Sequence, residues 1–231
     1  MRSEIISTLN LARRERRTAI VVSDLEGVMQ EVLLEGDVIA RSAIASEAVR
    51  RFGSGKSGMV EIEGRELFFN AHVPSPRLVI IGAVHISQAL AAIACIGGFD
   101  IVVIDPRSAF ATPARFPGIA LHAEWPEEVL KDTPLDTYTA VAILAHDPKI
   151  DDVPLIEALR KKCFYVGALG SRKTHMKRVD RLAKAGIGAE DIARIHAPIG
   201  LDIGAASPAE IAVAVMAEVI DALRKRGGEL T

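Results

Sequence analysis

Apolar runs alternate with segments of helical period through the middle of the chain. The run at 78–81 is aliphatic and β-branched, which predicts a buried parallel strand. Residues 86–96 predict a helix that Gly97 and Gly98 end, and a second apolar strand follows at 99–104. Together these segments predict one βαβ unit, the building block of a parallel sheet.

The same alternation continues toward the C-terminus. Strands are predicted at 119–122, 139–145 and 164–166, and helices at 127–130, 155–161, after Gly170, at 190–194 and at 208–226, with an irregular segment at 196–205. The fold class is therefore α/β. We expect a Rossmann-like parallel sheet with helices on both faces, in a domain that covers residues 77–231.

Residues 1–73 predict a separate, small N-terminal α+β domain. Helices are expected at 5–17 and 46–52, and short strands at 19–23, 31–34, 38–40, 59–62 and 66–70. The glycine-rich loop at 53–58 lacks the spacing of a phosphate-binding P-loop and follows a helix, so we interpret it as a flexible approach to a hairpin.

Composition narrows the class of protein. The chain has 231 residues and is 49% hydrophobic, so it can bury a full core. It carries 28 basic against 30 acidic residues, so it has no net positive charge that would attract nucleic acid or an anionic membrane. It contains no long apolar run of membrane-spanning length and no secretory signal pattern. Cys95 and Cys163 lack metal or redox spacing. We expect a cytoplasmic protein with two buried thiols.

Candidate chemistry gathers where strands end, because ligands of open parallel sheets bind beyond the carboxyl ends of the strands. The loops that carry polar groups there are 82–87, 105–107, 146–147 and 167–173, and the segment 196–204 is expected to join them. Arg107 and Arg172 suit phosphates. Ser171, Arg172 and Lys173 lie in the first turn of the helix after Gly170, where anions are favoured, whereas most cations of that helix are interpreted as a solvated face. We find no nucleophile with an adjacent base and no metal-ligand cluster, so no catalytic or metal residue is predicted.

The first loop only partly matches the dinucleotide fingerprint G-x-G-x-x-G/A. Gly82 is in place, but Val84 and Ser87 stand at the second and third glycine positions. A valine adds bulk and disfavours positive φ where the backbone would approach a pyrophosphate. Asp105 stands where an acid would take the ribose hydroxyls, so NAD(P) binding remains a weaker alternative.

At these residues the sequence resembles the XdhC/CoxI family of accessory proteins for xanthine dehydrogenase and related molybdenum hydroxylases. The resemblance is carried by GAVHISQAL, VVIDPRSAFATPARFP, HDPKIDD, FYVGALGSRKTH and RIHAPIGLDIGAASPAEIAVAV. It implies a site made of Gly82, His85, Asp105, Arg107, His146, Asp147, Gly167, Gly170, Ser171, Arg172, His196, Pro198, Gly200, Asp202 and Gly204.

The resemblance also implies a function. Members bind molybdenum cofactor, protect it while a cysteine desulfurase exchanges a molybdenum oxygen for sulfur, and hand it to the hydroxylase in its apo form. A homodimer is expected. Two departures bear on this: the family pattern GAGH has Val84 here, and the family's N-terminal GGGCVE turn is replaced at 39–44, without its cysteine. A sulfur relay through that thiol therefore does not carry over.

Three functions follow from these observations. The leading hypothesis is a non-catalytic maturation factor for molybdenum cofactor (molybdopterin). The alternatives are an NAD(P)-dependent oxidoreductase on the same Rossmann scaffold, and a partner-binding scaffold that has lost its pocket.

Overall fold

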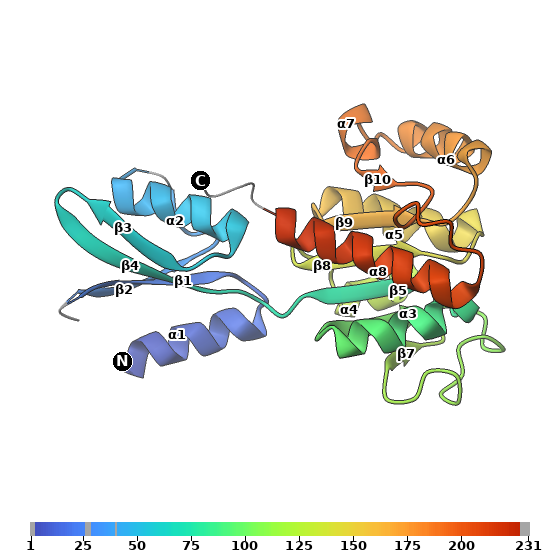
Figure 1. Cartoon of the computed structure of the whole chain (residues 1–231), viewed down its shortest axis with the longest axis horizontal. Coiled ribbons are helices and arrows are strands. Elements are labelled where there is room, and N and C mark those ends of the chain that lie inside the picture. The colour runs from blue at the N-terminus through green and yellow to red at the C-terminus, as the bar shows by residue number, and fades with distance from the viewer. Residues whose placement is uncertain (1–2, 26–28, 40, 227–231) are drawn as a thin grey trace. The chain divides into compact units, whose positions relative to one another are not determined.

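The structure, a computed structural model, describes residues 3–25, 29–39 and 41–226 (Figure 1). Contacts divide the chain into two compact units, a smaller one built mainly from residues before Ser75 and a larger one that covers Ser75–Arg224. Among the described residues, no helix combines the length and the apolarity that crossing a membrane requires.

The larger unit confirms the predicted α/β fold. Six strands of the described chain form one sheet in the order β10-β9-β8-β5-β6-β7, and every neighbouring pair is parallel. The strands are β5 (Arg77–Ile81), β6 (Asp100–Ile104), β7 (Ala120–His122), β8 (Thr139–Ile143), β9 (Tyr165–Ala168) and β10 (Ile195–His196). The chain runs from β5 to β6 on one side and later to β8 on the other, so β5 marks the switch point of the sheet.

Helices cover both faces of this sheet (Figure 1). They are α3 (His85–Ile96), α4 (Pro126–Asp132), α5 (Pro148–Arg160), α6 (Arg172–Lys184), α7 (Ala189–Ile192) and α8 (Pro208–Lys225). Leu78 and Ile80 pack in the apolar cluster that α3 and α8 cover, whereas Val79 and Ile81 pack with α4 and α5. This alternation buries all of β5, which explains why it is an unbroken apolar run in the sequence.

Three boundaries in the larger unit differ from the sequence prediction. Strand β9 extends to Ala168, so Gly167 lies in the strand and not in a turn. Helix α5 begins at Pro148, ahead of the range 155–161 expected for it, because Asp147 caps it and proline suits the first helical position. Part of the segment expected to be irregular pairs with β9 as the short strand β10.

The smaller unit holds an antiparallel sheet in the order β2-β1-β4-β3. Its elements are α1 (Ser3–Arg14), β1 (Ala19–Asp24), β2 (Gln30–Leu34), α2 (Ala43–Ser54), β3 (Gly58–Ile62) and β4 (Arg65–His72). Helix α2 contributes Phe52 to an apolar cluster with Ile20 and Phe69 of the sheet. Gly55 caps the helix with a left-handed φ of 67°, so this glycine ends a helix.

Two further expectations are wrong. The strand expected at 38–40 is absent at Val38 and Ile39, while residue 40 lies outside the described residues. Cys95 is exposed, because it lies on the solvent side of α3. Cys163 is buried as expected, and burial raises the pKa of its thiol to about 12, which keeps it protonated and unreactive.

Candidate functional site

The carboxyl ends of the parallel strands bring the predicted loops to one edge of the sheet. Gly82, directly after β5, donates its backbone N–H to Ile104 O at the end of β6 over 2.8 Å. On the other side of β5, Leu144 N donates to Ile81 O over 2.8 Å. The loops that begin at Gly82, Asp105 and Leu144 are therefore immediate neighbours at the switch point.

Gly82 is required by this close packing. Its φ is +103°, and a Cβ at this position would lie 2.7 Å from Ala145 N. Ser87 Oγ donates to Gly82 O and accepts from Val84 N, which closes the turn onto the first turn of α3. Val84 has a φ of −93°, so its backbone avoids the positive φ that a valine disfavours.

Asp105 organises the neighbouring loop. The carboxylate is completely buried and accepts four hydrogen bonds, from Ala83 N at 2.7 Å, Arg107 N at 3.0 Å and the Arg107 guanidinium at 2.8 and 2.7 Å. Burial alone would raise the pKa of Asp105, but these donors and the Arg107 charge outweigh it and hold the pKa below its usual value. All acceptor positions are filled, so Asp105 cannot receive the ribose hydroxyls that the dinucleotide fingerprint assigns to it.

Arg107 is held by the same contact. Its guanidinium lies 4.6 Å from the centre of the Phe110 ring. Asp105 raises the pKa of Arg107 most, and the charges of Asp147 and Asp151 add to this rise. The predicted phosphate ligand Arg107 is therefore committed largely to Asp105, and it also brings positive charge near the loop after β8.

The loop after β8 carries His146 and Asp147. Asp147 Oδ1 accepts from Lys149 N over 3.0 Å and so caps α5, which gives this predicted site residue a structural role. His146 is exposed and adopts a left-handed φ of 61°. Partial burial of its ring, and then the charge of Arg178, lower the pKa of His146, so the imidazole is neutral at neutral pH.

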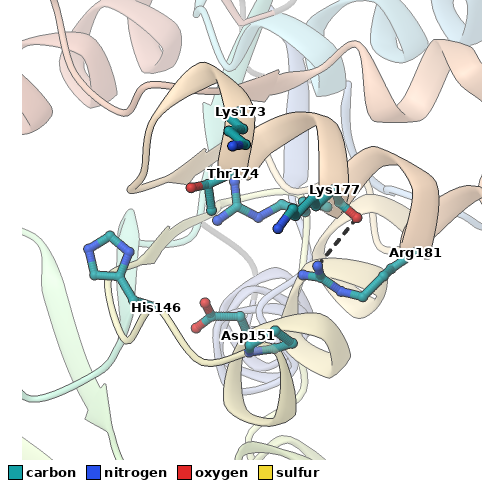
Figure 2. Close-up of a pocket in the computed structure, with 8 residues that line it drawn as sticks. His146, Asp151, Lys173, Thr174, Lys177 and Arg181 are labelled. Atoms are coloured by element: carbon teal, nitrogen blue, oxygen red, sulfur yellow. Dashed lines mark hydrogen bonds between the residues drawn. The ribbon is translucent and has the colours of Figure 1, made fainter.

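A cavity of about 240 Å³ lies between this loop, α5 and α6, and we name it the α5–α6 cavity. Its charged and polar lining includes His146, Asp151, Lys173, Lys177, Arg178 and Arg181. Figure 2 shows His146 and Asp151 facing Lys173 and Lys177 across this space. Of this set, the sequence prediction placed only His146 among the site residues. It put Lys173 in a helix turn that favours anions and interpreted most other cations of α6 as a solvated face.

Two charged side chains in the cavity lining are buried and incompletely paired. Arg178 is 2% exposed and its Nη2 donates to Leu169 O over 3.0 Å, but its Nε and Nη1 have no partner among the described residues. Asp151 is also 2% exposed, and its Oδ1 has no partner in that part of the chain. Buried charges are normally paired, so these atoms mark the cavity as a place for a ligand.

The loop after β9 contributes less than expected. Ser171 Oγ accepts from Thr174 N over 3.2 Å and caps α6. Gly170 has a φ of +133°, and a Cβ at Gly167 would collide with the Tyr165 hydroxyl at 2.5 Å. Arg172 is exposed and does not line the α5–α6 cavity, whose α6 residues begin at Lys173.

The segment after β10 is tied to α8 by Glu218, a residue that sequence reasoning missed. Glu218 accepts from the Tyr165 hydroxyl at 2.6 Å and from Gly200 N at 2.8 Å, and it contacts His196 Nδ1 at 2.9 Å. The Tyr165 and His196 rings stack with centroids 4.8 Å apart. A Cβ at Gly200 would lie 3.0 Å from Val215 N, so this glycine permits close packing on α8.

The predicted site residues thus fall into separate groups along one edge. Gly82, Asp105 and Arg107 form the first, His146 belongs to the cavity, and Gly167, His196 and Gly200 surround Glu218. His85, Arg172, Pro198, Asp202 and Gly204 are exposed. Within the described residues, no group of three or more His, Cys, Asp or Glu side chains is placed to hold a metal ion.

Most of the larger unit matches a known protein family. A family model described as the XdhC Rossmann domain matches residues 78–219. Among solved structures, a xanthine dehydrogenase from Bacillus halodurans is similar with a TM-score of 0.67 at 23% identity, and the match covers 96% of this chain and 67% of that one. At this identity the likeness concerns the fold.

Three curated relatives align with the chain. YqeB of Escherichia coli, described as uncharacterized, is 35% identical over 169 residues, which are 71% of this chain and 30% of that protein. A probable xanthine dehydrogenase subunit from Bacillus subtilis is 33% identical over 161 residues, 69% of this chain and 46% of the relative. The molybdenum cofactor insertion chaperone PaoD of Escherichia coli is 31% identical over 218 residues, 93% of this chain and 58% of PaoD. The chain thus spans between 30% and 58% of the length of these relatives.

Proposed function

The chain belongs to the XdhC family, and from this premise we propose that it is a maturation factor that binds molybdenum cofactor for a molybdenum hydroxylase. The observation that carries the proposal is the alignment with the molybdenum cofactor insertion chaperone PaoD, which extends over 93% of this chain. The Bacillus subtilis relative, named as part of a probable xanthine dehydrogenase, points to the same class of client enzyme.

The residues of the α5–α6 cavity suit part of such a ligand. Molybdopterin carries a phosphate, and the unpaired nitrogens of Arg178 together with Lys173 and Lys177 supply positive charge for an anion. His146, neutral and exposed at the cavity edge, can donate or accept a hydrogen bond to the rest of the ligand. Before delivery, residues of this chain would bind and orient the cofactor. After delivery, the cofactor would supply the redox chemistry of the client enzyme.

We propose that the bound cofactor is protected while a cysteine desulfurase replaces a molybdenum oxygen with sulfur, and that the protein then delivers it to the apo-hydroxylase as a homodimer. The oxidoreductase alternative is disfavoured because the four hydrogen bonds to Asp105 leave it no acceptor for a ribose hydroxyl.

Cofactor retention tests this proposal. Molybdenum cofactor released from a donor enzyme is mixed with the protein, and the pterin that elutes with it from a gel-filtration column is measured after oxidation to its fluorescent form. NADPH and CTP are titrated separately by calorimetry. Co-elution near one pterin per chain supports the maturation factor. Tight NADPH binding without pterin favours the oxidoreductase, and binding of no ligand favours the partner-binding scaffold.

A further inference from the structure

The α5–α6 cavity contains a buried cation whose hydrogen bonds are incomplete within the described residues. Arg178 is 2% exposed, and only its Nη2 is hydrogen-bonded, to Leu169 O. Burial lowers the pKa of its guanidinium, and the charge of Asp151 opposes that shift without forming a contact that satisfies Nε or Nη1. A buried guanidinium without its hydrogen bonds is costly, so its surroundings favour an anion that supplies the missing acceptors.

The surrounding charges favour the same kind of ligand. Lys173 and Lys177 line the cavity from the first two turns of α6, a 13-residue helix whose N-terminus favours anions. Arg181 is committed elsewhere, because its Nε and Nη2 bind the two carboxylate oxygens of Asp152 at 2.6 and 2.9 Å. This bidentate pair joins α6 to α5.

Asp151 adds an acidic group to this mostly cationic lining. Its buried carboxyl lines the same cavity, and Figure 2 shows it facing the space that His146 and Lys177 border. A carboxylate beside an anion repels it, whereas a protonated carboxyl donates a hydrogen bond to it. An anion can therefore bind between Arg178 and Asp151 only if either the anion or the Asp151 carboxyl carries a proton, which then forms a hydrogen bond between the two.

We propose that the α5–α6 cavity is a phosphate site in which Asp151 and the bound anion share one proton. The volume of about 240 Å³ accommodates a tetrahedral oxyanion with water. Arg178 supplies two donors, and Lys173 and Lys177 neutralise the remaining charge. The natural ligand is either an organic phosphate monoester or free phosphate. The inference rests on the proposed function only where that monoester is the cofactor's phosphate.

The pKa of Asp151 is shifted toward neutral pH. Burial raises the pKa of Asp151 to about 7; Arg178 and Arg181 of α6 oppose this rise, and Asp147 and Asp152 of α5 add to it. Arg107, from the loop after β6, also interacts with Asp151. His146 has a lowered pKa, so it stays neutral as Asp151 titrates.

The proposed site and a simple patch of cations differ in how pH affects the binding of different anions. The comparison uses anions that carry a proton and anions that do not. Above pH 7, sulfate and phenyl phosphate carry no proton, so each must bind to protonated Asp151. Their dissociation constants are expected to rise about tenfold between pH 7.5 and 8.5. Inorganic phosphate as HPO₄²⁻ donates its own proton to ionised Asp151, so its affinity is expected to change less than about threefold.

Calorimetric titration of the full chain with these three anions, in amine buffers at pH 6.5 to 8.5, measures both effects. In Asp151→Asn the amide donates at every pH, so sulfate binding is expected to become independent of pH. Lys173→Ala with Lys177→Ala is expected to weaken all three anions by about 10- to 100-fold. Lys184→Ala removes a cation from the last turn of the same helix and is the matched control, expected to change affinity less than twofold.

The outcomes separate the inference from the proposed function. Tighter binding of phenyl phosphate than of inorganic phosphate at pH 6.5 supports an organic ligand, and the reverse order supports free phosphate. Equal pH profiles for sulfate and inorganic phosphate, affinities unchanged in the double lysine variant, or no binding of any anion would overturn the site. Retention of cofactor without binding of any free anion would contradict the phosphate site but not the proposed function. Binding of anions as expected without retention of cofactor would contradict the proposed function but not the phosphate site.

Discussion

Glu218 on α8 and His196 on β10 lie 2.9 Å apart, measured from Oε1 to Nδ1, and the same carboxylate accepts from the Tyr165 hydroxyl and from Gly200 N. One side chain therefore connects the last strand, the segment that follows it and the C-terminal helix. Burial, and then the hydrogen bond to Glu218, raise the pKa of Tyr165, so its hydroxyl remains a donor at every physiological pH.

Glu218→Gln is expected to lower the free energy of unfolding by about 1 to 3 kcal/mol, because one amide oxygen replaces the two carboxylate oxygens that contact the Tyr165 hydroxyl, Gly200 N and His196. The expected fall in melting temperature is about 2 to 10 °C for a chain of this size. Thermal unfolding followed by circular dichroism measures it. Glu190→Gln, at an exposed position of α7, is the control and should be nearly neutral. Equal melting temperatures for both variants would contradict the role of Glu218.

Gly82→Ala is expected to destabilise the protein by about 2 to 4 kcal/mol. The new Cβ meets the Ala145 backbone at 2.7 Å, and the φ of +103° adds strain for any residue with a side chain. Gly186→Ala has a φ of +81° with no atom within 4 Å, so it isolates the strain and should cost only about 1 kcal/mol. Urea denaturation measures both, and a cost for Gly82→Ala no larger than that of Gly186→Ala would refute the close packing.

Asp151 predicts an unusual dependence of stability on pH. Its pKa is about 7 in the folded protein against an ordinary value of 3.8, so between these values the folded state binds more protons than the unfolded state. The contribution of Asp151 to stability is present at pH 4 and is lost as pH rises toward 7. Asp151→Asn should therefore become more stable than the parent by roughly 3 to 4 kcal/mol at pH 8 relative to pH 4.

Urea denaturation of the parent and of Asp151→Asn at pH 4, 6 and 8 provides this comparison. A difference that stays constant across the three pH values would show that the carboxyl of Asp151 is solvated and titrates normally. Asp152→Asn serves as the contrast, although it also removes the ion pair with Arg181.

The two neighbouring cations at the start of α6 are expected to differ in cofactor binding. Lys173 lines the α5–α6 cavity and Arg172 does not. Lys173→Ala should weaken retention of molybdenum cofactor by about 5- to 20-fold, whereas Arg172→Ala should change it less than about twofold. The gel-filtration assay measures both. The opposite order would return Arg172 to the role that the family resemblance implies for it.

The periodic parts of the fold were predictable from sequence. Strands β5 and β6 and helix α3 lie within one or two residues of their expected bounds, because buried strands and a helix ended by glycine leave strong local patterns. Gly167 was misplaced into a turn because glycine usually interrupts strands, whereas here it makes room for Tyr165 and Ile199. That requirement comes from tertiary packing.

The cavity was not predictable by the same means. Asp151 and Arg178 lie on different helices, and their proximity depends on how α5 and α6 pack. One signal was present: Arg178 precedes Leu182 by four residues, so both lie on the same face of α6, and Leu182 is buried. An arginine on the inward face of an amphipathic helix indicates a buried charge that needs a partner.

The most direct test of the central proposal supplies the protein to a client enzyme. An apo-molybdenum hydroxylase is incubated with molybdenum cofactor, a cysteine desulfurase and increasing amounts of this protein, and the active fraction of the hydroxylase is measured. The proposal predicts that this fraction rises in proportion to the protein added and levels off near one equivalent. An active fraction that is independent of the added protein, or turnover of a nicotinamide substrate by the protein alone, would contradict it.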